Sequence, residues 1–179
     1  MEEYKKQIAA DNISVLKQGR ELIQCISTTI YRSAFPGMKQ GTIGAHFRHC
    51  LEIYQCLING LDETRIDYEN RPRSKELETD PERAIDAIDE LITELDQLCY
   101  PVWKQYLKIS YRITGDGCKC ELDSSIEREL KFMISHTIHH YALIKMILLH
   151  YDIPVDDQFG VAPSTLAHWK NNKNGVRQT

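Results

Sequence analysis

The chain has 179 residues, 42% of them hydrophobic, with 22 basic and 26 acidic residues and a formal net charge of −4. This length and composition predict one globular domain over residues 1–179 with a substantial hydrophobic core. The basic residues form no stripe, which argues against binding nucleic acid through its phosphates. The N-terminus is charged from its second residue, and Lys145 interrupts the longest apolar run. We therefore expect no secretory signal, no membrane span and a cytoplasmic location.

Hydrophobic periodicity predicts two long amphipathic helices in the first third of the chain. Apolar residues recur at helical spacing over residues 2–30, and the loop-forming segment Pro36–Gly41 follows. Thr42 is the expected N-cap of a second helix over residues 43–61. The charged stretch 63–78 is expected to be an irregular connection, of a length that is often functional or mobile.

Two capping patterns predict two further long helices. The sequence Thr79–Glu82 combines a capping residue with a proline in the first turn and indicates a helix over residues 80–99. The sequence Ser124–Glu127 indicates the start of a fourth helix over residues 125–151. The alternating apolar and polar residues between these helices, followed by the turn sequence Gly115–Gly117, predict a short β-hairpin.

Four long amphipathic helices in a small chain predict an all-α fold, a four-helix bundle with a short β-hairpin between helices three and four. The tail over residues 152–179 is expected to be loop-like, with one short helix at residues 163–171. Its stretch Phe159–Trp169 is too apolar for a free tail. We expect it to pack on the bundle, where it could close a site or a dimer contact.

Metal-binding residues are expected among the histidines. The six cysteines include no two pairs at zinc-finger spacing, and we interpret them as reduced. Of the seven histidines, five fall in two short segments, with two in a segment of the second predicted helix and three in a segment of the fourth. They are His46, His49, His136, His139 and His140.

His136 and His140 are four residues apart, so a helix places them about one turn apart on one face. Two imidazoles at this spacing can bind one metal ion, as in the HExxH helix of zinc proteases. No glutamate follows His136, so the general base of those proteases is missing. The alternative is that the rings are ordinary residues with hydrogen-bond partners.

The second helix offers the third ligand, from either His46 or His49. These residues are three apart and both lie on the face that carries Ile53. Three histidine ligands would leave coordination positions open for water or substrate. That pattern is typical of a catalytic zinc site rather than a closed structural one.

The stretches TIGAHFRHCLEIYQ and SHTIHHYALI together resemble the DinB-like superfamily, also called DinB/YfiT-like metalloenzymes. The resemblance follows the order of elements from Ile43 to about Leu149. It implies a four-helix bundle with a divalent zinc, nickel or iron ion. Carried over to this sequence, the ligands are His49, His136 and His140.

The resemblance also separates the two histidines of the second helix. In the related domain of the ergothioneine-pathway sulfoxide synthases, the second histidine of a His-x-x-His is the ligand, which implies His49. His46 and His139 would then contact a ligand histidine without binding the metal, or would contact the substrate. The alternative for both is a hydrogen bond to a neighbouring helix.

The resemblance implies an enzyme that acts on a small molecule, either a hydrolase or a thiol S-transferase. It is also compatible with a homodimer. A divalent ion on three neutral imidazoles would lower the pKa of bound water toward ~7, or that of a bound thiol. The candidate acid–base groups are Glu52, Tyr54 and Tyr141. The alternative for each of them is an ordinary structural role. The alternative function is a non-catalytic protein that binds a metal or a small ligand.

The charged connection contributes Arg65, Arg71 and Arg73. If the connection folds over the mouth of the bundle, these arginines could hold a carboxylate or phosphate of the substrate. The alternative is a solvated charged loop.

Overall fold

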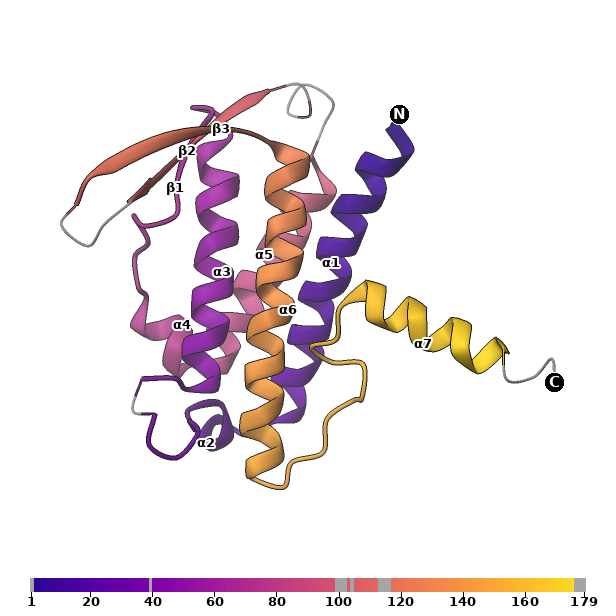
Figure 1. The fold of residues 1–179 in the computed structure, drawn as a ribbon. Coiled ribbons are helices and arrows are strands. Elements are labelled where there is room, and N and C mark those ends of the chain that lie inside the picture. Colours follow the sequence, from indigo (N-terminus) through magenta and orange to yellow (C-terminus); the bar gives the residue numbers. More distant parts are fainter. Residues whose placement is uncertain (1, 39, 99–102, 104, 113–116, 176–179) are drawn as a thin grey trace.

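A computed structural model describes residues 2–38, 40–98, 103, 105–112 and 117–175. Within these ranges the chain forms seven helices and a three-stranded sheet (Figure 1). The long helices are α1 (Glu2–Cys25), α3 (Ile43–Gly60), α5 (Pro81–Asp96) and α6 (Ile126–His150). The other elements are α2 (Thr28–Tyr31), β1 (Arg65–Asp67), α4 (Lys75–Thr79), β2 (Tyr106–Arg112), β3 (Lys119–Ser125) and α7 (Pro163–Gly175).

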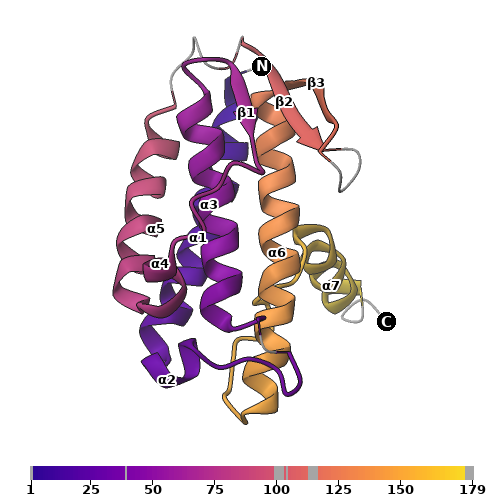
Figure 2. The ribbon, with the colours of Figure 1, turned by 90° about the vertical axis from the view of Figure 1, so that its left-hand side faces the viewer.

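The four long helices pack side by side, and we call this group the helical core. Helix α1 contacts α5 and α6, and α3 contacts the same two helices. Helices α1 and α6 run in one direction and α3 and α5 in the other (Figure 1). The sheet lies across the end of the helical core where α3 ends and α6 begins. The connection from β1 to α4 runs back along α3 (Figure 2).

The prediction of an all-α four-helix bundle is wrong. The chain is mostly helical, but its strands form a mixed sheet in the order β1-β2-β3, and short helices accompany the long ones. The antiparallel hairpin β2–β3 is the expected one. Strand β1 is an addition that pairs in parallel with β2, with Arg65 opposite Lys108. Three residues within a charged connection show too little alternation to predict a strand.

The second predicted helix is confirmed, whereas the first is divided. The side chain of Thr42 accepts a hydrogen bond from the backbone N–H of Ala45 and caps α3. The helix predicted over residues 2–30 breaks because Ser27 caps a separate short helix, α2. The predicted irregular connection also contains a helix, α4.

The cap residues of the last two long helices differ from those predicted by one position. Thr79 ends α4, and Asp80 caps α5 by accepting from the backbone N–H of Glu82 at 3.0 Å. Ser125 rather than Ser124 caps α6. Helix α5 ends at Asp96, before the predicted end at residue 99, which itself lies outside the described ranges. The turn residues 115–116 also lie outside them.

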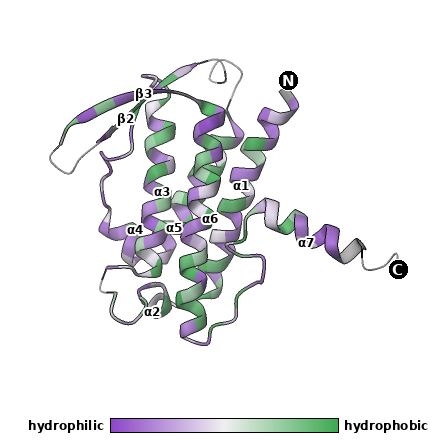
Figure 3. Cartoon of the chain, viewed as in Figure 1, coloured by the Kyte–Doolittle hydropathy of each residue, from purple (hydrophilic) through white to green (hydrophobic). Residues whose placement is uncertain are grey.

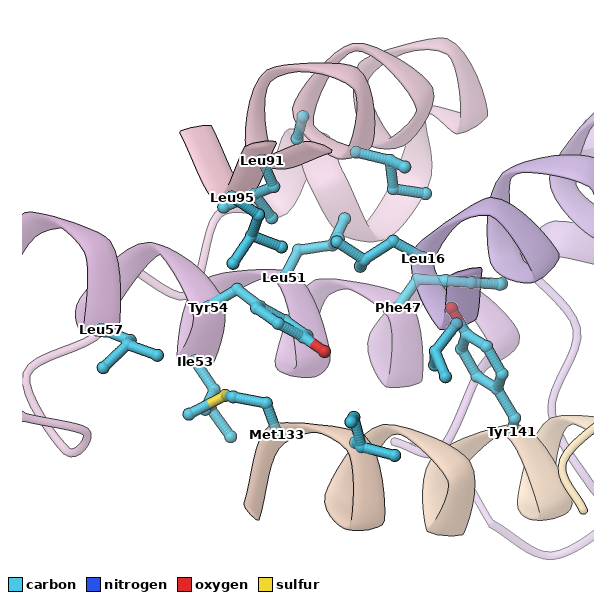
Figure 4. Close-up of a cluster of buried hydrophobic side chains, with 14 of the residues drawn as sticks. Leu16, Phe47, Leu51, Ile53, Tyr54, Leu57, Leu91, Leu95, Met133 and Tyr141 are labelled. Atoms are coloured by element: carbon cyan, nitrogen blue, oxygen red, sulfur yellow. The ribbon is translucent and has the colours of Figure 1, made fainter. Parts of the chain in front are cut away.

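The hydrophobic core lies between the long helices (Figure 4). Leu51 and Tyr54 of α3 are at most 1% exposed, and Leu51 points toward side chains of α5, such as Leu91. Met133 of α6 is also buried and lies on the side of α3 that faces away from α5 (Figure 4). Each fully buried side chain of this size stabilises the fold by roughly 1.5–3 kcal/mol.

Part of the tail packs on the helical core, as its apolar composition predicts. Phe159 is 5% exposed, and its ring stacks on Tyr141 with 4.7 Å between centroids. The predicted short helix forms as α7, which projects from the helical core and is mostly hydrophilic (Figure 3). No helix among the described residues is both long and apolar enough to cross a membrane.

Candidate metal centre

Helices α3 and α6 bring three half-buried histidines together. One ligand nitrogen from each of His49, His136 and His140 lies within 4.8 Å of the other two. The Nε2 atoms of His49 and His136 are 2.9 Å apart. The ring of His140 lies 4.7 Å from both of the other rings, measured between centroids. The spacing of four residues on α6 and the contact between α3 and α6 together produce this arrangement.

The three nitrogens fit a divalent ion with imidazole ligands. Zinc binds imidazole nitrogen at about 2.0–2.1 Å, so tetrahedral geometry sets the ligand atoms roughly 3.3 Å apart. The distance of 2.9 Å between Nε2 of His49 and Nε2 of His136 is shorter than that separation. The upper limit of 4.8 Å on the distances among the three ligand nitrogens is longer than it. Small rotations of the rings would therefore reach coordination geometry.

His46 lies behind His140 rather than beside the other two ligand candidates. Its Nδ1 is 2.9 Å from Nδ1 of His140, which leaves Nε2 of His140 free to face the centre. A ligand imidazole carries its remaining proton on the second nitrogen, and a fixed acceptor for that proton holds the ring. His139 is exposed, and its ring lies 5.5 Å from that of His140.

All four inward-facing rings have pKa values below the usual 6.5. Burial, followed by the charges of Arg71 and His136, lowers the pKa of His49 to about 4. Burial, followed by the neighbouring histidines, lowers the pKa of His140 to about 3. The pKa values of His46 and His136 are also lowered, chiefly by burial. These rings are therefore neutral at pH 7, and each has one nitrogen lone pair that a metal can use once the ring proton is on the other nitrogen.

Arg71 approaches His49 from the side opposite His136. Its Nη1 contacts Nδ1 of His49, whereas Nε2 of the same ring faces His136. The backbone N–H of Ser74 donates to Oε1 of Glu52 at 2.6 Å, which fixes the connection against α3 close to Arg71. This arrangement explains why Arg71 is the arginine of the connection that reaches the histidines.

The other two arginines of the connection lie elsewhere. Arg65 forms an ion pair with Glu121 at 2.9 Å on the sheet. Arg73 is exposed and has a positive φ of 53°. Neither is in contact with the described histidines.

The three candidate acid–base groups have structural roles. Glu52 is 1% exposed and accepts the hydrogen bond from Ser74. The hydroxyl of Tyr54 donates to Oδ1 of Asn12 at 2.7 Å, inside the helical core. Tyr141 is buried, and its hydroxyl lies against Gly19 of α1, away from the three-histidine centre. None of them points to the ligand nitrogens.

Two features of the structure were missed by sequence reasoning, a ring contact beside the centre and a cavity that no histidine lines. The ring of Phe132 lies 5.3 Å from that of His136, and its position four residues earlier on α6 could have indicated this contact. A cavity of about 830 Å³ lies along α3 and the sheet, with Glu52, Cys56, Asp67, Asn70, Pro72 and Lys119 among its lining residues. No spacing in the sequence predicts this cavity, because its walls come from distant segments.

Comparison with known proteins assigns no family to the chain. No protein-family model matches it, and no solved structure matches it. The chain is 33% identical over 108 residues to FK506-binding protein 5 of Rhizopus delemar. The aligned region covers 60% of this chain but only 28% of that protein. The similarity therefore shows neither the family nor the activity of this chain.

Proposed function

We propose that the chain is a divalent-metal-dependent enzyme in which His49, His136 and His140 hold zinc, nickel or iron. The observation that carries this proposal is the convergence of three neutral imidazole nitrogens from two helices within 4.8 Å. Three protein ligands leave positions for water or substrate. The resemblance of the two histidine stretches to the DinB-like superfamily supports the same metal site.

The metal would activate water or a thiol for attack on a small molecule, so the reaction class is hydrolysis or thiol S-transfer. The surrounding residues hold the ligands in place. His46 accepts the Nδ1 proton of His140 and fixes the orientation of that ring. Phe132 covers one side of His136 and limits access of water. The exposed His139 is proposed to face the substrate.

Elemental analysis of untagged protein tests the proposal. Wild type is expected to contain close to one divalent ion per chain, and His49→Ala and His140→Ala are expected to contain almost none. His150→Ala is the matched control, because this exposed histidine lies on α6 away from the centre. A wild type that holds no metal after incubation with zinc, nickel or iron(II) would refute the proposal.

Activity assays then separate the enzyme from a non-catalytic metal-binding protein. Loaded wild type and the two ligand variants would be compared on ester and thiol-transfer substrates. Turnover that disappears in both variants supports catalysis, whereas a full metal site without turnover supports the binding protein.

A further inference from the structure

The contact between Arg71 and His49 fixes where the ring proton of His49 lies. A guanidinium group has only N–H donors, so Nδ1 of His49 must accept in this contact. The neutral ring then carries its proton on Nε2. There it faces Nε2 of His136 at 2.9 Å and can donate a hydrogen bond.

This proton position is incompatible with a metal at the centre. A metal bound to Nε2 of His49 uses the lone pair of that atom, so the ring proton must move to Nδ1. Two N–H donors, one from each residue, would then face each other. The positive charge of Arg71 would also lie close to a divalent ion. The Arg71–His49 contact and the metal therefore exclude each other.

Among the residues that the structure describes, Arg71 has no hydrogen-bond partner besides His49. Its Nε is buried and makes no hydrogen bond. None of the ion pairs found among the described residues involves Arg71.

The chain around Arg71 is also tied down. Glu69 binds Arg112 of β2, and Ser74 donates to Glu52 of α3. These attachments keep the guanidinium near the centre, where a cation without an anion is costly.

We propose that Arg71 is the oxyanion-binding residue of this site. As the metal binds, the guanidinium leaves His49 and pairs with a carboxylate or phosphate group of the ligand. The fork of N–H donors on a guanidinium matches the geometry of both groups. The metal and the oxyanion then strengthen each other's binding by the same factor. This inference rests on the proposed metal site and assigns its ligands to the class of small oxyanions.

Zinc titrations followed by calorimetry test the inference. Untagged wild type, Arg71→Met and Arg71→Gln are titrated alone, with acetate and with inorganic phosphate, and corrected for zinc complexes in solution. Without an oxyanion, both Arg71 variants are expected to bind zinc about fivefold or more tightly than wild type. The oxyanion is expected to tighten zinc binding by a similar factor in wild type and not in the variants.

Arg73→Met is the matched control, since Arg73 belongs to the same connection but is exposed and away from the histidines. It is expected to behave like wild type. An effect of acetate alone, phosphate alone or both supports the inference and identifies the group recognised.

Equal zinc affinities in wild type and both Arg71 variants, without a differential oxyanion effect, would overturn the inference and leave the metal site standing. A wild type that binds no zinc, nickel or iron(II) would remove the metal site and the inference together.

Discussion

Gly19 of α1 is expected to tolerate no side chain, because Tyr141 occupies the space. A Cβ at this position would lie 2.1 Å from the hydroxyl oxygen of Tyr141 and 2.9 Å from Cε1 of Phe47. Both rings are 1% exposed, and Phe159 stacks on the far side of Tyr141, so neither ring can retreat easily.

The free-energy cost of Gly19→Ala can be bounded from these contacts. Overpacking in a close-packed core costs about 1–3 kcal/mol, and a contact of 2.1 Å belongs at the upper end. Replacing glycine by alanine inside a helix gains about 1 kcal/mol. We therefore expect a net destabilisation of about 2 kcal/mol for Gly19→Ala.

A second substitution isolates the clash. Tyr141→Phe removes the hydroxyl, so Gly19→Ala should cost at least about 1 kcal/mol less in the Tyr141→Phe background than in wild type. The assay is urea unfolding of metal-free protein followed by circular dichroism. Ser14→Ala, at an exposed position of α1, is the control and is expected to be neutral or slightly stabilising. A fully stable Gly19→Ala, or equal costs in both backgrounds, would contradict this packing of Tyr141.

Three further predictions concern the centre and its support. His46→Ala is expected to weaken zinc binding roughly 10–100-fold in calorimetry, whereas His139→Ala leaves it almost unchanged, since His46 hydrogen-bonds to His140 and the exposed His139 makes a ring contact alone. Glu129→Gln is expected to lower the free energy of unfolding in urea by about 2 kcal/mol, because this fully buried carboxylate accepts three hydrogen bonds. Burial lowers the pKa of His49 to about 4 and that of His140 to about 3. In metal-free protein the unfolded state therefore binds more protons than the folded one from about pH 6.5 down to these values. Thermal stability should therefore fall as the pH falls through this window, and should fall less in His140→Gln.

The helices and the histidine cluster were predictable because local signals determine them. Periodic apolar residues indicate which helix face is buried, and the side chain of Thr42 marks where α3 begins. His136 and His140 share a helix face by spacing alone. Which histidine of α3 joins them depends on how α3 is rotated against α6, and the sequence does not encode that rotation at short range.

Strand β1 and the path of the connection were not predictable from local signals, unlike the hairpin β2–β3. Strand β1 has three residues and pairs with β2, a segment far away in the sequence. Loop-closing contacts of this kind leave no periodic pattern. The one-residue errors at Asp80 and Ser125 have a simpler reason, because neighbouring Thr, Asp and Ser residues are all good caps.

The unpredicted strand β1 has a direct consequence for the histidines. Strand β1 and the attachment of Glu69 to Arg112 fix the start of the connection on β2. The hydroxyl of Tyr68 then donates to Glu129 at the start of α6, at 2.6 Å. These contacts direct the following residues along α3, so that Arg71 meets His49.

An arginine placed by several long-range contacts is unlike a solvated charge on a loose loop. Glu129 is fully buried and still accepts from Tyr68, so the start of α6 and the connection are held as one unit. Loosening that unit should therefore act on the centre without touching a ligand. Tyr68→Phe removes one of its hydrogen bonds and should shift zinc affinity in the same direction as Arg71→Met, by a smaller factor. An unchanged affinity would mean that the position of Arg71 does not depend on this attachment.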